Sequence, residues 1–479
     1  MSLLDRLSEP TVWEKFYQYK TSLACPKDIE KRLRGFLDAQ EYLPVCELIS
    51  KIAKNPQDPA FSGVQGVSQS RAFPEIQGVS QSRAFPESQG VSQSRAFPLP
   101  RKSVISKQST QKKRVVYTYP FAENTVLKLL TYLLLRTYND LFSDNLFSFR
   151  PGRSAQEAIR RLQKIPNLYQ KYTYKVDVSN YFNSIPVERL LPDLETITRE
   201  DPELFTFLKA LLTEPYVIDD GAPSHRDAAP QITGQSVLIK EQKGIMAGTP
   251  LASFYANLYL RDVDQWFHDQ NIPYARYSDD VIVFGDTMEE VQKHANAIRS
   301  FLGAKGLSVN PAKEEFRRPE EGFVFLGFLL KKGVIDVAPA SVTKIKQKMR
   351  RKARALQRWK NRNHLPGDKA AKAFIRIFNR KLLESPQDTD LSWSYWYFSS
   401  INTTESLHVI DLYAQECLRF LLTGTHTKSR FNARYEDLKR LGYETLVNAY
   451  YKQSAMNAVP AKRRTATLTK ENKNGSHEE

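Results

Sequence analysis

Residues 274–285 read Tyr-Ala-Arg-Tyr-Ser-Asp-Asp-Val-Ile-Val-Phe-Gly, and this stretch decides the fold. Aromatic and β-branched residues predict two short strands, 274–277 and 281–284. The residues between them, a serine followed by Asp279 and Asp280, are types that turns favour. The pattern therefore predicts a β-hairpin with two carboxylates at its tip. Such a pair is either an exposed turn or, because adjacent acids in an apolar setting need a compensating charge, a site for a divalent cation.

The composition indicates a globular protein with a polyanionic partner. The 479 residues are 41% hydrophobic and 26% charged, which fits roughly three domains of about 150 residues each. The net charge of +17 favours nucleic acid, because clustered Lys and Arg displace counterions from a phosphate backbone. The alternative is a basic surface without such a partner, but the 23 Tyr and 26 Phe residues also offer faces on which bases can stack.

The sequence shows no mark of export and no metal-binding cysteine pattern. It has no apolar run long enough to span a bilayer, and its first residues lack the basic region, apolar core and cleavage site of a secretory signal. We therefore expect a cytoplasmic protein without a membrane partner. Cys25, Cys46 and Cys417 are isolated and odd in number, which argues against disulfides or a zinc site and favours small core residues.

The first hundred residues divide into two parts. Apolar residues at helical spacing predict that residues 1–60 form a helical N-terminal extension. Residues 61–100 contain a twelve-residue tandem repeat that ends at Pro100 and has Gly and Pro in each unit, which predicts a disordered insertion. The alternative is a flexible tether or an arm that contacts phosphates through its arginines. The units begin at Gln65, Gln77 and Gln89.

Basic residues next occur in two places that suit anion binding. The cluster 112–114 leads into a strand-like run that ends near Pro120, and a helix is expected from about Glu123 to Tyr138. Further on, the sequence 149–154 reads Phe-Arg-Pro-Gly-Arg-Ser, and its serine forms a Ser-x-x-Glu capping box that predicts a helix start. Its arginines therefore precede a helix N-terminus, where anions bind favourably.

A second acidic element comes about a hundred residues before the hairpin. Residues 172–178, Tyr-Thr-Tyr-Lys-Val-Asp-Val, predict a strand that carries Asp177 near its end. A carboxylate in such a strand needs a partner, since unpaired burial destabilises a fold by several kcal/mol, roughly. Between this strand and the hairpin, residues 187–213 predict helices and 216–240 a β-hairpin. The segment 244–260 predicts a Gly-rich loop that runs into an amphipathic helix.

This order of elements resembles the palm of a reverse transcriptase, over about residues 112–330 and more loosely to about 452. The resemblance implies an α+β right-hand polymerase fold, with fingers and palm containing antiparallel sheet at 101–335, a helical thumb and C-terminal region at 336–454, and a disordered tail at 455–479. The matching motifs are Arg114, Phe149 to Ser154, Val176 to Phe182, Gly244 to Leu260, Tyr277 to Asp280, Gly306 to Lys313, and Phe325 to Phe328.

The resemblance implies two-metal phosphoryl transfer with Mg²⁺, or with Mn²⁺ in its place. Asp177 and Asp279 would bridge the two cations, the Val178 carbonyl would complete the shell, and Asp280 would be a supporting acid or a further ligand. Phe182 would be the steric gate that excludes a ribose 2′-hydroxyl; otherwise it is an ordinary core residue.

The remaining site residues also follow from the resemblance. Arg114 and Lys113 would contact the triphosphate, with Arg150 and Gly244 as further nucleotide contacts. Arg150 has a structural alternative, because an Arg-Pro-Gly turn can serve packing alone. Lys313 would protonate pyrophosphate, unless it is a solvated lysine. Leu326 and Gly327 would form the primer-grip turn.

Three features depart from the family pattern. Ser278 stands where Ala or Met is commoner, and Lys243 stands where a Gln usually precedes the Gly. The second change puts the template or nucleotide contacts at that position in doubt. The third departure is the repeat insertion before the fingers.

The helical stretch 344–362 is rich in Lys and Arg. Such a run is either a solvated face or, after a palm, the part of a thumb that contacts the nucleic-acid backbone. We favour backbone contact, through Lys344, Lys348, Arg351, Arg354 and Arg358.

The sequence has no endonuclease, RNase H or transposition pattern, which argues against a mobile intron or retroelement. The resemblance implies a bacterial reverse transcriptase of the defence-associated or abortive-infection group, which copies a cognate structured noncoding RNA into DNA from dNTPs. A retron-type enzyme is the near alternative, and an RNA-directed RNA polymerase a weaker one. The alternative from another class is a catalytically idle RNA-binding scaffold, against which the intact acids argue. The sequence carries no signal for oligomeric state.

Overall fold

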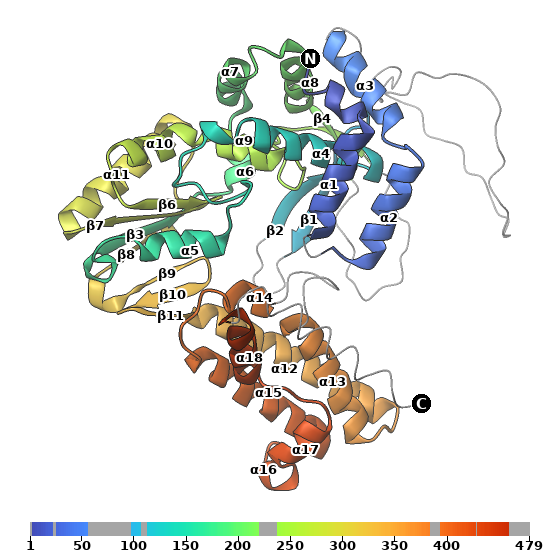
Figure 1. Cartoon of the computed structure of the whole chain (residues 1–479), viewed down its shortest axis with the longest axis vertical. Helices are drawn as coiled ribbons and strands as arrows, with labels where there is room; N and C mark the ends of the chain where they lie inside the picture. Colours follow the sequence, from blue (N-terminus) through green and yellow to red (C-terminus); the bar gives the residue numbers. More distant parts are fainter. Residues whose placement is uncertain are drawn as a thin grey trace, which may run out of the picture.

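The computed structural model describes residues 2–22, 25–55, 97–106, 113–219, 237–383, 393–427 and 429–458. Helices at the N-terminus and a mixed helix and sheet region form the upper part of Figure 1, and the C-terminal helices form the lower part. This arrangement confirms the predicted α+β class with antiparallel sheets. The repeat up to residue 96, the hairpin tip at 220–236 and the tail from 459 lie outside the described residues.

The N-terminal extension is helical, as predicted, and packs against α4 of the central region (Figure 1). Trp13 forms its centre: the ring lies edge-on to Phe36, at 5.9 Å between centroids, and its Nε1 donates to the Leu7 carbonyl at 2.7 Å. Phe16 continues this contact to Tyr132 of α4, at 5.5 Å. The helices are α1 Pro10–Ser22, α2 Lys27–Asp38, α3 Leu43–Lys54 and α4 Phe121–Thr137.

One four-stranded sheet lies beside these helices, in the order β2-β1-β4-β5. The chain enters it through the last repeat unit, whose Phe97 is fully buried edge-on to Tyr119 and Phe207 at 5.7 and 5.9 Å. Residues 97–100, which the sequence assigned to the disordered insertion, therefore join the folded part of the chain, because neighbouring aromatics bury Phe97. The strands are β1 Arg101–Ser106, β2 Lys113–Thr118, β4 Tyr216–Asp219 and β5 Val237–Lys240.

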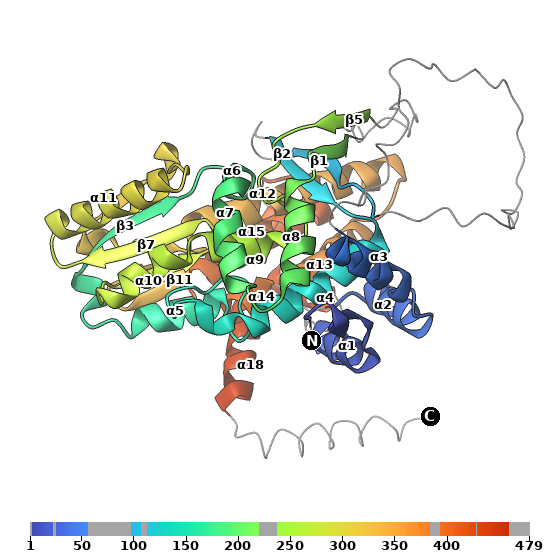
Figure 2. The same ribbon diagram turned by 90° about the horizontal axis from the view of Figure 1, so that it is seen from above.

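A second four-stranded sheet carries the acidic motifs, in the order β6-β7-β3-β8. Its strands pair antiparallel, and Asp177 at the end of β3 lies opposite Asp280 at the start of β7. Helix α11, Met288–Ala304, packs on β3 and β7 and lies beside them in Figure 2. The predicted hairpin and its preceding acidic strand are confirmed: β3 Tyr172–Asp177, β6 Tyr274–Tyr277, β7 Asp280–Gly285 and β8 Glu315–Arg317.

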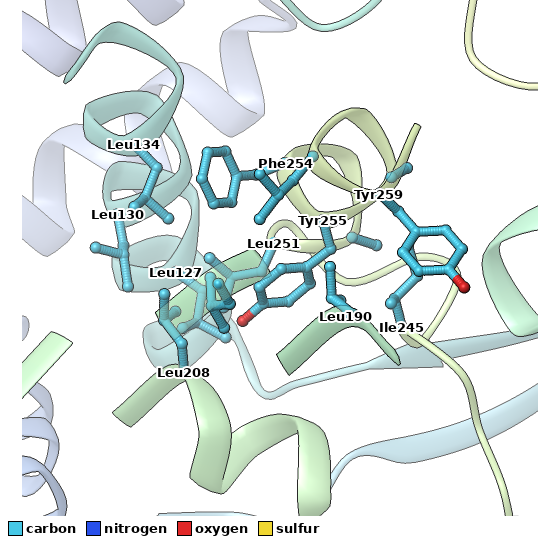
Figure 3. Packing of buried hydrophobic residues seen from close by; sticks show 14 of the residues in the cluster. Leu127, Leu130, Leu134, Leu190, Leu208, Ile245, Leu251, Phe254, Tyr255 and Tyr259 are labelled. Carbon is cyan, nitrogen blue, oxygen red and sulfur yellow. The ribbon is translucent and has the colours of Figure 1, made fainter. Parts of the chain in front are cut away.

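A core between α4 and α9, Ala252–Tyr259, holds the sheets and helices together. In Figure 3, Leu127, Leu130 and Leu134 of α4 lie toward Phe254 and Tyr255 of α9. All five side chains are fully buried. The helical prediction for 187–213 is also correct, as α7 Val187–Ile197 and α8 Pro202–Thr213.

A three-stranded sheet, in the order β11-β10-β9, lies between the acidic sheet and the C-terminal helices (Figure 1). The predicted basic helix is α12, whose buried stripe includes Ile345, Met349 and Leu356 and whose basic residues face outward. It packs along α13 and α15. The elements are β9 Phe323–Phe325, β10 Phe328–Lys331, β11 Val334–Val337, α12 Pro339–Arg362, α13 Gly367–Leu382 and α15 Glu405–Thr423.

Short helices complete the described chain. The last one ends at Ala458, so four residues that the sequence assigned to the tail, 455–458, belong to a helix. Within the described ranges, no helix has both the length and the apolar character needed to cross a membrane. The short elements are η1 Asp5–Ser8, η2 Asn139–Leu141, α5 Ala155–Gln163, η3 Leu168–Gln170, α6 Tyr181–Ser184, α10 Arg261–Asp269, η4 Pro311–Lys313, η5 Pro319–Glu321, α14 Trp393–Tyr397, α16 Ser429–Asn432, α17 Tyr435–Arg440 and α18 Leu446–Ala458.

Candidate active site

A cavity of about 280 Å³ gathers many of the predicted site residues. Its walls come from β2, the end of β3, α6, the loop before α9, the β6–β7 turn and η4. The lining residues are Arg114, Asp177, Val178, Asn180, Tyr181, Phe182, Asn183, Ala247, Asp279, Asn310 and Lys313.

Asp177 and Asp279 bring two carboxylates to this cavity from different strands. The turn residue before Asp279, Ser278, has a left-handed backbone with φ of 61°. The Val178 N–H donates to the Asp279 carbonyl at 3.1 Å, which joins the turn to the end of β3. Burial, and then the negative charge of Asp177, raise the pKa of Asp279. The two acids therefore repel each other in a partly desolvated site that favours a bound cation.

Lys313 partly compensates this charge. Its Nζ forms an ion pair with the Asp177 carboxylate. The loop that carries Lys313 is fixed to the same strand, because the Asn310 N–H donates to the Asp177 carbonyl at 2.9 Å. Lys313 and Arg114 both lower the pKa of Asp279, opposing the effect of burial.

Asp280 takes a different place from Asp279. It is not among the described residues that line the cavity, although it lies opposite Asp177 in the strand ladder. Burial raises the pKa of Asp280 to about 6, with Lys175 acting in the opposite direction. This position fits the supporting role that the sequence predicted better than direct coordination.

The donor set fits a hard divalent cation. Asp177, Asp279 and the backbone of Val178 offer oxygen ligands, which Mg²⁺ prefers. Within the part of the chain that the structure describes, no three His, Cys, Asp or Glu side chains are close enough to form a complete metal site by themselves. A cation here would therefore take further ligands from water or from substrate phosphates, as Mg²⁺ commonly does.

Sequence reasoning missed the residues that hold the acidic turn in place. Arg276 and Asp264 are fully buried and form a bidentate ion pair, with Nε and Nη2 donating at 2.8 and 2.6 Å. Arg276 also donates to the Ser278 carbonyl at 3.2 Å, inside the turn. Tyr274 adds a hydroxyl bond of 3.0 Å to Asp264. The available signal in the sequence was a charged residue, Arg276, within the buried strand 274–277, since such a residue needs a partner.

The segment just before the Phe149–Ser154 motif contributes to the same support. Ser148 Oγ accepts from the Ser278 N–H at 2.8 Å, and the Asn257 side chain donates to the Ser148 carbonyl at 3.0 Å. Arg276 exchanges backbone hydrogen bonds with the same loop, to Asn145 and from Phe147. The loop before α5 is thus joined to the acidic hairpin. Of the predicted capping box, the bond from the Glu157 N–H to Ser154 is present.

Arg150 is not among the residues that line the cavity, and its contacts favour the structural alternative over the predicted nucleotide contact. The side chain is 7% exposed, and its guanidinium donates to the Asn139 side chain and carbonyl and to the Ser143 and Leu146 carbonyls. These bonds occupy Nε and both terminal nitrogens, so the residue closes the loop 139–146. These bonds are those expected of an Arg-Pro-Gly turn that serves packing.

Phe182 lines the cavity, whereas Gly244 lies behind it. Gly244 has φ of 55°, and a Cβ there would lie 2.6 Å from the Phe182 carbonyl oxygen. This close approach explains the glycine by backbone packing behind Phe182, whereas the predicted nucleotide contact stays a prediction. The exposed ring of Phe149 lies edge-on to Phe182 at 6.4 Å.

The other predicted residues lie away from the cavity or outside the described part. Lys112 and the side chain of Lys113 belong to the undescribed residues. Leu326 and Gly327 form a tight turn with positive φ at both positions, and the Gly327 carbonyl accepts from Ala338 at 2.8 Å. The predicted nucleic-acid contacts are exposed on α12: Lys344, Lys348, Arg351, Arg354 and Arg358.

Comparison with known proteins assigns this region to a class. Residues 105–330 match the model of the family described as reverse transcriptase (RNA-dependent DNA polymerase). The chain therefore contains a reverse transcriptase domain, the fold of a nucleotidyltransferase, and the cavity lies within it. Among curated proteins no sequence matches the chain.

Three solved structures show limited similarity. An apo telomerase from Candida tropicalis truncated from its C-terminal domain shares 14% identity, with 50% of this chain and 55% of that chain covered and a TM-score of 0.39. The apo telomerase of the same organism shares 14%, covering 72% and 69%, with a TM-score of 0.40. A Candida albicans telomerase in complex with a fragment of telomeric RNA shares 10%, covering 73% and 67%, at 0.35. The chain thus spans just over half the length of the first of these.

The Arg276–Asp264 pair provides a direct test of the site's support. Replacing Arg276 with Met leaves the buried Asp264 charge uncompensated, so we expect the free energy of unfolding in urea to fall by about 3–5 kcal/mol. The double variant Arg276→Met, Asp264→Leu removes both charges and should recover most of that loss. Equal stability of the wild type and the single variant would show that the pair does not hold the hairpin.

Proposed function

We propose that the chain is an RNA-directed DNA polymerase that extends a primer on an RNA template. The observation that carries this proposal is the convergence of Asp177 and Asp279 on one cavity with Arg114, Phe182 and Lys313. The acids come from β3 and from the β6–β7 turn, within the region that matches the reverse transcriptase family.

The residues suit phosphoryl transfer. Two divalent cations, with Mg²⁺ as the first choice and Mn²⁺ as the alternative, would supply activation of the primer 3′-hydroxyl and stabilisation of the leaving pyrophosphate. Asp177 and Asp279 would hold them, the Val178 carbonyl would complete the shell, and Asp280 would support the acids from the neighbouring strand position. Arg114 would bind the triphosphate, since its guanidinium is exposed on β2 at the cavity wall.

Lys313 and Phe182 would act on the two ends of the incoming nucleotide. The side chain of Lys313 is about half exposed and paired with Asp177, so it can move to the pyrophosphate and donate a proton there. Phe182 would exclude a ribose 2′-hydroxyl from the cavity by its bulk. Its ring is fixed by the edge-on contacts with Phe149 and Tyr181.

The nucleic acid would extend from the cavity toward the C-terminal helices. The exposed Lys and Arg residues of α12 would contact its phosphate backbone, and the turn at Leu326 and Gly327 would hold the primer. In this scheme residues 101–335 form fingers and palm, and 336–454 the thumb and C-terminal region.

We further propose a role in bacterial antiviral defence, with a cognate structured noncoding RNA as template, dNTPs as substrates and DNA as product. This assignment rests on the sequence resemblance to the defence-associated group. A retron-type enzyme remains the near alternative, and an idle RNA-binding scaffold is opposed by the paired acids in the cavity. The cytoplasmic location is also a prediction of the sequence.

Replacement of Asp279 tests the activity. Asp279→Asn should reduce cDNA synthesis from an RNA template, with Mg²⁺ and dNTPs, by roughly a hundredfold or more, because the site loses a cation ligand and much of its electrostatic stabilisation. The matched control is Asp286→Asn, directly after the last residue of β7, with a side chain 72% exposed. Unchanged synthesis by Asp279→Asn would refute the polymerase mechanism.

Phe182 controls sugar selection in this proposal. Phe182→Val should lower the preference for dNTPs over NTPs by roughly tenfold to a hundredfold, because the cavity gains room beside the sugar. The ratio of kcat/KM values for the two substrates measures the effect. Phe316→Val, on β8 and outside the cavity, should leave the ratio unchanged. A wild type that uses both substrates equally would instead favour the RNA polymerase alternative.

The template can be identified by sequencing the nucleic acid that copurifies with the protein from infected and uninfected cells. We expect one structured RNA and DNA complementary to it, with the DNA absent from the Asp279→Asn variant. The plating efficiency of phage should rise in cells that carry this variant. Random RNA without matching DNA, together with unchanged protection, would contradict both the cognate template and the defence role.

A further inference from the structure

A second cavity lies behind the proposed active site. It has a volume of about 670 Å³, and its lining includes Asn183, Pro186, Leu191, Leu212, Lys240 and Lys243. Asn183 lines both cavities, so the segment around Phe182 and Asn183 separates them.

Lys243 has no bonding partner in this cavity. The residue is 3% exposed, and within the described ranges its Nζ makes no hydrogen bond. Burying an ammonium group without an acceptor is strongly unfavourable. Burial accordingly lowers the pKa of Lys243 to about 8, although Glu214 and Glu241 act in the opposite direction.

Three carboxylates line the cavity: Glu188 is exposed, and the two that act on Lys243 are engaged elsewhere. Glu241 forms an ion pair with Lys102 and accepts from the Tyr117 hydroxyl at 2.7 Å. Glu214 accepts from the Tyr216 N–H at 3.0 Å. They moderate the potential around Lys243 but leave its three N–H donors unsatisfied.

We propose that this second cavity binds a phosphate ester, with Lys243 donating to the phosphate oxygens from inside and Lys240 from the mouth. A phosphate carries several strong acceptors and can satisfy both amines. The walls at Pro186, Leu191 and Leu212 suit the less polar body of the ester, and the volume is that of a small-molecule site. The phosphate belongs either to a free mononucleotide or to an RNA strand, two sources of the same chemistry.

The site is physically connected to the proposed nucleotide cavity, and this part of the inference rests on the proposed function. Gly244 follows Lys243 and packs against the Phe182 carbonyl, which also accepts from the Ile245 N–H at 2.9 Å. An ester bound at Lys243 would therefore restrain the backbone of Phe182. Occupancy of the second cavity thereby regulates nucleotide selection in the first.

The test measures thermal unfolding of the wild type and of Lys243→Met with AMP or with a short single-stranded RNA. EDTA is included, so that metal-dependent binding at the carboxylates is suppressed. We expect Lys243→Met alone to melt at the same or a higher temperature, because it removes an unpaired buried charge. We expect it to bind at least one probe at least tenfold more weakly than the wild type. Lys332→Met, an exposed lysine outside the cavity, is the matched control.

The probe that Lys243→Met binds more weakly identifies the source of the phosphate. Weaker binding of AMP indicates a free nucleotide, and weaker binding of RNA alone indicates a strand. Since the Lys243 ammonium donates only while protonated, wild-type affinity should fall as the pH rises from 7 to 9, and the affinity of Lys243→Met should not. Equal binding of both probes by wild type and variant would overturn the proposal. Because this experiment measures binding and not catalysis, its outcome can be told apart from a failure of the wild type to synthesise cDNA.

Discussion

The buried ion pair between Arg276 and Asp264 fixes the geometry on which the proposed active site depends. One bidentate pair of hydrogen bonds joins α10 to β6, and a further bond of the guanidinium ends on the Ser278 carbonyl in the acidic turn. The stability gained from such a pair is small, since desolvation offsets much of the attraction. Its effect is positional: it holds the backbone of a left-handed turn and thereby the carboxylate of Asp279.

The charged side chains around this turn differ in whether they have a partner of opposite charge. Asp177 has Lys313 as a partner, whereas burial and Asp177 raise the pKa of Asp279. Behind the same wall, the Lys243 ammonium lacks an acceptor among the described residues. The domain thus holds a carboxylate with a raised pKa and a buried ammonium without a hydrogen-bond acceptor in adjacent cavities, which is why we propose a cation site in one and an anion site in the other.

Much of this organisation was predictable, and the exceptions have physical causes. Strand alternation and turn residues predicted the hairpin and Asp177, because local sequence determines both. The role of Arg150 was not predictable, because a motif before a helix does not reveal which carbonyl oxygens the Arg150 guanidinium reaches. The burial of Phe97 was missed because the sequence around it recurs in the earlier repeat units, so that only its tertiary neighbours reveal the burial. In the sequence, Lys243 was visible only as a departure from a family pattern. Its burial could not be predicted without the tertiary structure.

The central claim is that Asp177 and Asp279 jointly bind divalent cations. Titration of Mn²⁺ into the protein, followed by calorimetry in the presence of a non-hydrolysable dNTP, tests it without measuring catalysis. The account predicts that Asp177→Asn and Asp279→Asn each weaken Mn²⁺ binding by at least about tenfold, since each loses an anionic ligand. Asp280→Asn should have a smaller effect. Equal Mn²⁺ affinity in the wild type and in both cavity variants would contradict the account.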